Sequence, residues 1–194
     1  KNGIYIFTPP SQTISLPPDA SGIDFTGSLP DLGFLVDQDG YSFSNSSPVW
    51  GEYPRDAFDF DNDSLIRMFG EQAVCRMVGS TCFIDPRATK FQMRANWKMN
   101  VGHCDGMAST SLRFFKKLDQ PGDFQSGANT TQDLMIANIR EQIAFYHVKQ
   151  YTTPLMAYKD QIRQLTPTEI LEMLADALSD GASDPVTMVV AQPG

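Results

Sequence analysis

The spacing of apolar positions changes character near residue 62. Before it, two short strand-like runs, Ile4 to Phe7 and Phe34 to Val36, stand between stretches rich in Pro, Gly, Ser and Asp. After it, apolar residues recur at the spacing of amphipathic helices. We therefore divide the chain into a loop-rich arm or propeptide-like cover, residues 1–64, and a helical part that holds the remaining residues, 65–194.

Capping signals bound the predicted helices. A short helix is predicted between an N-cap at Asn62, Asp63 or Ser64 and a stop at Gly70. Two more helices are predicted to follow, over residues 86–99 and 104–118.

The fourth predicted helix begins at Thr130 with Asp133 and carries one apolar stripe. The stripe consists of Ile136, Ile139, Ile143 and Tyr146. The last helix has the clearest start, because Thr166 and Glu169 form a capping box around Pro167.

The apolar face of that last helix precedes a stop at Gly181, and the run "DPVTMVVAQPG" then predicts a buried strand. The face consists of Ile170, Leu174 and Leu178. A buried strand needs neighbours for its hydrogen bonds, and the sequence offers none. The predicted fold class is α+β, with helices followed by the start of a β-sheet whose other strands lie outside this chain.

Composition narrows the classes of partner. The 194 residues are 41% hydrophobic and 20% charged, which is typical of a globular domain. The net charge of −8 and the pI of about 4.6 disfavour nucleic acid and anionic membranes as partners. No apolar run approaches the roughly 20 residues of a membrane-spanning helix. No phosphate-binding glycine loop or zinc motif is present, so we expect neither a cofactor nor a metal.

Three cysteines leave two interpretations open. Cys75 and Cys82 stand seven residues apart around a Gly-Ser turn that brings them within reach of a disulfide, which we favour. Cys104 is then the odd thiol. The alternative is that all three are reduced, as in a cytosolic protein.

Four carboxylates lie close together in "DAFDFDND". Asp59, Asp61 and Asp63 imitate the opening of a calcium loop, but Ser64 replaces the glycine of the sixth position and no glutamate fills the twelfth. We interpret these carboxylates, Asp56 included, as residues that cap a helix N-terminus and favour its dipole.

Cys104 has two alternative interpretations. Gly102 and Gly106 flank it, and a helix beginning here would place the thiol on free N–H groups that lower its pKa and hold an oxyanion. The alternative is a buried, inert cysteine. The two histidines do not decide between them: adjacent His103 is badly placed for proton transfer, and His147 is best interpreted as a packed residue.

The stretch from Gly102 to Ala108 resembles the Gly-x-Cys-x-Gly-Met-[Ala/Ser] signature of papain-like bacterial proteins, most of them exported. The resemblance extends to "FDNDSLIRMFGEQAVC", "IAFYHVKQY" and "LTPTEILEMLADALSDGASDPVTMVV", roughly the final two-thirds of the chain. It implies a papain-like fold in which Cys104 opens the central helix. In that family a Gly-His-Ala-Val motif with the catalytic histidine follows the strand that resembles "PVTMVV", and this chain ends before it.

The resemblance implies a thiol hydrolase, a cysteine peptidase, that acts on a protein or peptide substrate through an acyl-enzyme on Cys104. Its histidine is expected on a C-terminal segment or a second chain that packs against this one. Asn96 or Asn100 is the expected second oxyanion donor, and the Cys75–Cys82 bridge is structural. The alternative is a non-catalytic papain-like binding module. In either case the resemblance implies a secreted or cell-surface bacterial protein.

Overall fold

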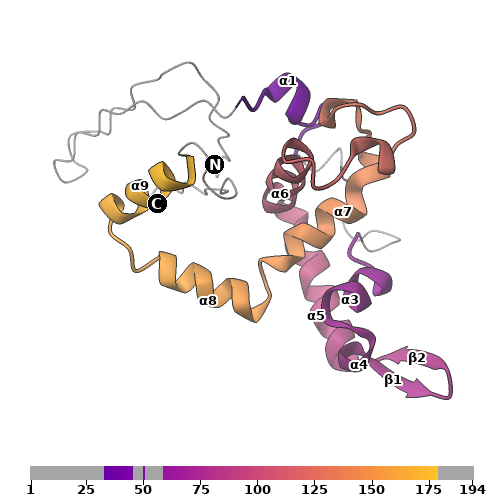
Figure 1. Cartoon of the computed structure of the whole chain (residues 1–194). Helices are drawn as coiled ribbons and strands as arrows, with labels where there is room; N and C mark the ends of the chain where they lie inside the picture. The colour runs from indigo at the N-terminus through magenta and orange to yellow at the C-terminus, as the bar shows by residue number, and fades with distance from the viewer. Residues whose placement is uncertain (1–32, 46–49, 51–58, 179–194) are drawn as a thin grey trace.

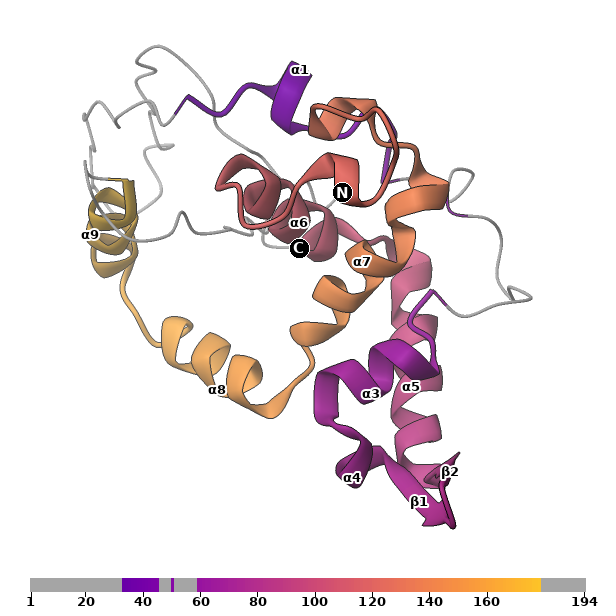
Figure 2. The same ribbon diagram turned by 45° about the vertical axis from the view of Figure 1, so that its right-hand side comes forward.

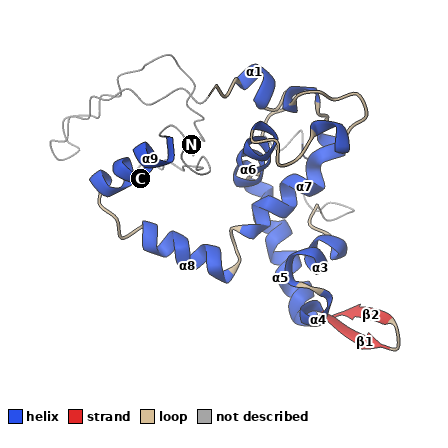
Figure 3. Ribbon diagram, viewed as in Figure 1, coloured by secondary structure: helices blue, strands red, loops and turns tan. Residues whose placement is uncertain are grey.

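The computed structural model describes residues 33–45, 50 and 59–178 of the chain. These residues are mostly helical, with one two-stranded antiparallel sheet (Figure 3). The elements in chain order are α1 (Val36–Asp39), α3 (Asn62–Phe69), α4 (Glu71–Val74), β1 (Cys75–Val78), β2 (Thr81–Ile84), α5 (Pro86–Lys98), η1 (Met99–Val101), α6 (Cys104–Phe115), η2 (Pro121–Asp123), η3 (Thr131–Asp133), α7 (Ile136–Lys149), α8 (Thr153–Ile162) and α9 (Pro167–Leu178). The mixture of helices and a small sheet agrees with the predicted α+β class.

Two groups of helices meet at α7. Helices α3, α4 and α5 and the hairpin lie at one end, α6 crosses α7, and α8 and α9 lead away from α7 (Figures 1 and 2). One apolar cluster joins α3, α4 and α5 to α7, and a second joins Trp50, α6 and the loop after it to α7. Helix α7 is therefore buried on more than the single predicted stripe, with Phe145 and Val148 facing the first cluster and Ile139 and Ile143 the second.

Local caps explain most helix starts. Asp61, one residue before the predicted candidates, caps α3 by accepting a hydrogen bond from the Ser64 amide at 2.8 Å. Asp85 caps α5 in the same way, with Pro86 at the first helical position. The predicted capping box at Thr166 and Glu169 is confirmed at the start of α9.

The structure corrects two boundaries. The box of Thr130 and Asp133 is formed, but it opens the short η3, and α7 begins only at Ile136 because Leu134 is extended. Helix α6 ends at Phe115, three residues early, where Lys117 takes a positive φ of 56°.

Two local predictions differ more strongly from the structure. The strand expected at Phe34 to Val36 is wrong, because Val36 begins the short helix α1 and the Phe34 ring packs edge-on against Phe115. Helix α8 was not predicted, although Pro154 stands in its first turn. The strand-like runs at Ile4 to Phe7 and in the last eleven residues lie outside the described residues.

The predicted disulfide is present. Cys75 and Cys82 are bonded across the β1–β2 hairpin, with their Cα atoms 5.2 Å apart. They sit diagonally, since Cys75 faces Ile84 and Cys82 faces Met77 in the strand register. Gly79 has a φ of 61° at the first turn position, which is where a type II′ hairpin turn requires glycine.

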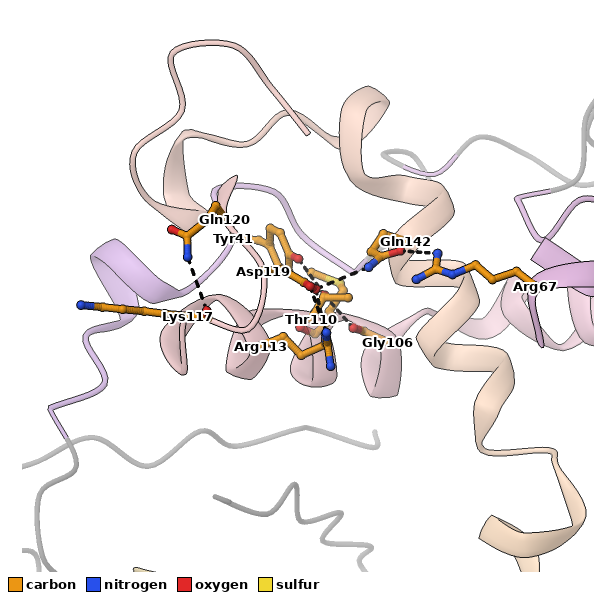
Figure 4. Close-up of polar contacts among 10 residues, drawn as sticks. Tyr41, Arg67, Gly106, Thr110, Arg113, Lys117, Asp119, Gln120 and Gln142 are labelled. Carbon is orange, nitrogen blue, oxygen red and sulfur yellow. Dashed lines mark hydrogen bonds and ion pairs between the residues drawn. The ribbon is translucent and has the colours of Figure 1, made fainter. Parts of the chain in front are cut away.

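A polar network fixes α6 to its neighbours (Figure 4). Tyr41 and Thr110 share a hydrogen bond of 2.7 Å, and the Thr110 hydroxyl donates to the Gly106 carbonyl. Further along α6, Arg113 donates two hydrogen bonds to the Asp119 carboxylate. Gln142 of α7 also donates to Asp119 and accepts a hydrogen bond from Arg67 of α3. The nucleophile candidate therefore stands on a helix held at several points.

The described part of the arm runs antiparallel to α6. Phe34 contacts Phe115, the Asp39 carbonyl accepts from Ser111, and Asn45 and Trp50 reach His103. The buried side chains of Phe34 and Trp50 belong to the core. The division at residue 64 and the role of residues 1–64 stay predictions.

Candidate functional site

Cys104 is the first residue of α6, as the sequence predicts. The preceding Gly102 has a φ of 135°, which only glycine adopts readily, and it allows the chain to turn sharply into the helix. His103 is the N-cap and its carbonyl accepts the first helical bond, from Met107. The Cys104 thiol is partly exposed and free, so this backbone presents a reachable sulfur at a helix N-terminus.

The protonation of the thiol differs from the expectation. Burial raises the pKa of Cys104, and the neighbouring Asp105 carboxylate adds to the effect. Hydrogen bonding from the main-chain amides of Asp105 and Cys104, together with the charge of Lys159, lowers that pKa but does not outweigh burial. The helix N-terminus is therefore present, while the lowered thiol pKa expected from it is not.

One side of Cys104 is sealed by aromatic and ionic contacts to His103. The His103 ring is fully buried and stacks on Trp50, with ring centroids 3.7 Å apart and planes 10° from parallel. Its Nε2 lies 3.4 Å from an Asp59 carboxylate oxygen, and that carboxylate is only 5% exposed. Trp50 therefore covers one face of the His103 ring, and Asp59 lies against its edge.

Arg140 of α7 and Asn45 of the arm complete this sealed side. The Arg140 Nε lies 2.9 Å from the Asp59 carboxylate, and its guanidinium donates to the Trp50 carbonyl at 2.7 Å. The His103 amide donates to the Asn45 side chain at 2.6 Å. These contacts hold the main chain immediately before Cys104.

The last turn of α7 packs closely against Gly106, two residues after Cys104 in α6. Its His147 is 4% exposed, and the Nε2 atom lies 3.2 Å from both the Tyr151 hydroxyl and the Gln150 amide. Burial lowers the pKa of His147 to about 3, and the nearby His103 and Lys159 lower it further. The imidazole is neutral at physiological pH, so it can orient a hydroxyl but takes up a proton poorly.

Charges near the thiol come from three elements. Lys159 of α8 donates to Gln150 at 3.3 Å and opposes the burial that raises the pKa of Asp105. Burial raises the pKa of Tyr151 to about 12, and the charges of Asp105 and Cys104 contribute. Lys98 lies over the Tyr151 ring at 4.1 Å. The thiol thus lies within range of the positive charge of Lys159, and its own charge acts on Tyr151.

The two candidate oxyanion donors differ in availability. Asn96 is buried, accepts from the Phe60 amide and donates to the Phe60 and Gln92 carbonyls, so both its amide hydrogens are used. That geometry contradicts a role for Asn96 in binding substrate. The Asn100 side chain, four residues before Cys104, makes no hydrogen bond with the described residues: its buried oxygen, which can only accept, is unpaired, and its Nδ2 donor is not used. It remains the candidate.

The acidic cluster has a structural role. Asp61 caps α3, which confirms the predicted function of that carboxylate, and Asp63 lies in the first turn of α3. Asp59 instead turns inward to Arg140 and His103, while Asp56 lies outside the described residues. Within residues 33–45, 50 and 59–178 no group of three or more metal-ligating side chains gathers.

A cavity of about 430 Å³ lies away from Cys104, against α3, α4 and the start of α5. Its lining includes Leu65, Phe69 and Phe91, and none of its residues belongs to α6, α7 or α8. Among the described helices, none is long and apolar enough to cross a bilayer.

Several residues of this site were not predicted. Trp50, Asn45 and Asp59 reach His103 from more than 40 residues away, and nothing in the sequence signals those contacts. Tyr151 lies four residues after His147, a spacing that puts both on one helix face and could have paired them. The arrangement as a whole offers a positioned thiol, main-chain amides that hydrogen bond to it and a nearby hydroxyl, while the low pKa of His147 makes that imidazole a poor base.

A comparison of the chain with protein-family models found no match, and comparisons with curated proteins and with solved structures found none either.

Proposed function

We propose that the chain is the nucleophile-bearing part of a papain-like thiol hydrolase, a cysteine peptidase, in which Cys104 is the nucleophile. The observation that carries this proposal is the placement of the thiol. It is the first residue of α6, it follows a glycine with positive φ, and it faces main-chain amides. Such amides stabilise the oxyanion that forms when a thiol attacks a carbonyl.

The reaction follows from this placement. The Cys104 sulfur forms a bond to the carbonyl carbon of a peptide, and the Cys104 amide with the Asn100 side chain holds the oxyanion. The C–N bond then breaks, and the amine leaves with the proton that the thiol gave up. Water hydrolyses the resulting thioester, which returns the thiol.

A base from outside the described residues has to move that proton. The chain has two histidines. His103 is stacked and paired with Asp59, and the pKa of His147 is too low for a base near neutral pH. We therefore assign the base to a histidine on a C-terminal segment or a second polypeptide. The raised thiol pKa fits a site that lacks an imidazolium partner.

The disulfide supports a proposed location. Disulfides such as Cys75–Cys82 persist in oxidising compartments and are rare in the cytosol. We propose a secreted or cell-surface bacterial protein that acts on protein or peptide substrates.

A second candidate function is a non-catalytic papain-like module that binds a partner. The raised pKa of Cys104 favours this alternative, because a thiol that stays protonated at neutral pH is a poor nucleophile. It predicts that an added base accelerates reaction of the thiol no more than it accelerates a small thiol of equal pKa.

Chemical rescue separates the two functions. The chain is mixed with a p-nitrophenyl ester at neutral pH, and release of p-nitrophenolate is followed as free imidazole is added in place of the absent histidine. The expected result is a burst of one equivalent whose rate rises and saturates with imidazole. Cys104 is the free thiol beside an intact disulfide, so mass spectrometry assigns the acyl group directly.

Matched variants sharpen the result. Cys104→Ser abolishes the burst, and Asn100→Ala slows it by about a hundredfold because an oxyanion donor is lost. Asn129→Ala, on an exposed loop, leaves the rate unchanged. A rate that rises linearly with imidazole, as for a small thiol of equal pKa, would instead establish the non-catalytic module.

A further inference from the structure

Positive charge is concentrated in one short part of this acidic chain. Residues 72–104 contain five of the fifteen basic residues and one carboxylate, Asp85, so ten basic residues and 22 carboxylates remain for the rest. The five are Arg76, Arg87, Lys90, Arg94 and Lys98. This part consists mainly of the hairpin and α5, which lie at the end of the structure farthest from α9 (Figures 1 and 2).

The basic residues of α5 share one face of the helix. Arg87, Lys90, Arg94 and Lys98 follow one another at intervals of three, four and four residues, which places them in one row about 16 Å long. Lys90 and Arg94 are exposed and make no ion pair with any other described residue. Their positive field is therefore unbalanced by the part of the chain that the structure describes.

The row continues onto the hairpin. Arg87 lies 3.3 Å from Asp85, and the charge of Arg76 on β1 also acts on that carboxylate, lowering its pKa together with Arg87. Arg76 faces Phe83 across the two strands, and the Phe83 side chain is 51% exposed. The hairpin therefore presents a basic side chain beside an exposed aromatic one.

The cavity of about 430 Å³ opens beside this row. Arg87 and Asp85 stand in its wall, and the remaining lining is apolar. The apolar lining consists of Leu65, Phe69, Ala73, Val74, Ala88 and Phe91. Two further apolar side chains, Met93 and Trp97, are more than half exposed one helix turn apart on α5, next to the basic row. Exposed Trp, Met and Arg are the residues enriched in protein interfaces.

One kind of occupant satisfies both features. A polypeptide segment rich in Asp and Glu supplies carboxylates for the row, and one large apolar side chain fills the cavity. A nucleic acid offers nothing larger than the thymine methyl group to fill an apolar cavity. An anionic bilayer would also approach Glu71 and the acidic start of α3 at the same end of the molecule, and those carboxylates oppose it.

We propose that the surface formed by the cavity and the basic row of α5 binds an acidic segment of a partner protein, anchored by one large apolar side chain. The anchor enters between α3, α4 and α5, and the partner's carboxylates contact Arg87, Lys90 and Arg94. Apart from Lys98 at the end of the row, which lies over the Tyr151 ring, the surface shares no residue with the Cys104 site, and the contacts proposed for the partner do not involve Lys98.

The test measures fluorescence anisotropy of a labelled synthetic peptide in which one phenylalanine stands between pairs of glutamates. The peptide is expected to bind at low ionic strength and to weaken as salt screens the row. Two control peptides isolate the contributions: phenylalanine to serine removes the anchor, and glutamate to glutamine removes the charge. Each is expected to weaken binding by about tenfold, which corresponds to one or two lost contacts.

Variants of the protein locate the binding surface. The double substitution Lys90→Glu and Arg94→Glu is expected to lower the affinity by about tenfold or more, because attraction becomes repulsion. Ala73→Phe fills the cavity from exposed α4 and is expected to abolish the contribution of the anchor. Lys116→Glu, an exposed charge reversal after α6, serves as the matched control and leaves the affinity unchanged. Circular dichroism verifies that each variant is folded.

Three outcomes would overturn the proposal. The first is equal binding of the phenylalanine and serine peptides, or none at all. The second is equal loss of affinity in Lys116→Glu and in the double variant. The third is binding of phosphatidylserine vesicles through Lys90 and Arg94 while the acidic peptide fails to compete.

Discussion

His103 and His147 flank Cys104 in contrasting surroundings. On the His103 side the side chains are buried and come from distant parts of the sequence. The His103 ring stacks on Trp50, and Asp59 forms an ion pair with Arg140. The His147 side combines neutral hydrogen bonds to Tyr151 and Gln150 with a nearby Lys159. The difference indicates a division of labour in which the first side fixes the main chain before the thiol and the second sets the protonation around it.

The largest expected loss of stability comes from a substitution on the His103 side. Arg140→Ala leaves the Asp59 carboxylate buried at 5% exposure without its guanidinium partner. Removing one member of a buried pair costs about 4 kcal/mol of unfolding free energy. Urea unfolding measures that free energy, and Arg163→Ala is the matched control because its pair with Asp160 is exposed and contributes well under about 1 kcal/mol. A loss from Arg140→Ala as small as that of the control would show that the sealed side does not hold the fold together.

The next effect tests the junction of α6 with α7. A methyl group added at Gly106 would collide with the Ile143 carbonyl and crowd the His147 Cβ. Gly106→Ala therefore has to separate the helices, which destabilises the fold by about 3 kcal/mol, typical of overpacking. Gly122→Ala is the control, since its methyl group would lie at an ordinary distance of 3.5 Å from the Ala128 carbonyl. Equal melting temperatures for the two variants would contradict the close packing.

The same contrast explains what the sequence could predict. Helix starts depend on a few neighbouring residues, so the capping box of Thr166 and Glu169, the helix beginning at Pro86 and the one beginning at Cys104 were predicted correctly. The disulfide is also local, because a two-residue turn brings Cys75 and Cys82 together.

The contacts of the sealed side depend on tertiary packing and were not predicted. Asp59 belongs to a run of carboxylates whose pattern indicates helix capping, and only the packing of α7 brings Arg140 beside it. Asn96 fails as an oxyanion donor for the same reason, because Phe60, 36 residues earlier, uses its amide. Spacing along the chain does not reveal which polar group is already satisfied.

The third prediction concerns the pH dependence of stability and isolates the His147 side. Burial lowers the pKa of folded His147 to about 3 from its ordinary 6.5, so between these pH values the unfolded chain binds a proton that the folded chain does not. Stability is therefore lost as the pH falls through that range, by about 2 kcal/mol at pH 5. Urea unfolding near pH 7 and near pH 5 is compared for the wild type and His147→Leu. His147→Leu is expected to lose less stability between pH 7 and pH 5 than the wild type. Equal losses would show that the pKa of His147 does not differ between the folded and the unfolded chain.

The smallest effect on stability separates protonation from architecture. Tyr151→Phe removes the hydroxyl that lies 3.2 Å from the His147 Nε2, and the loss of one hydrogen bond costs about 1 kcal/mol. The hydroxyl is close enough to the thiol for the charge of Cys104 to contribute to the raised pKa of Tyr151. A hydroxyl at that range can turn toward the sulfur once a thiolate forms, so its removal is expected to slow alkylation of Cys104 by iodoacetamide at neutral pH. Tyr158→Phe, on the exposed face of α8, is the matched control and leaves both quantities unchanged. If Tyr151→Phe lowered stability without slowing alkylation, the His147 side would be structural like the His103 side, and the division of labour between the two would not hold.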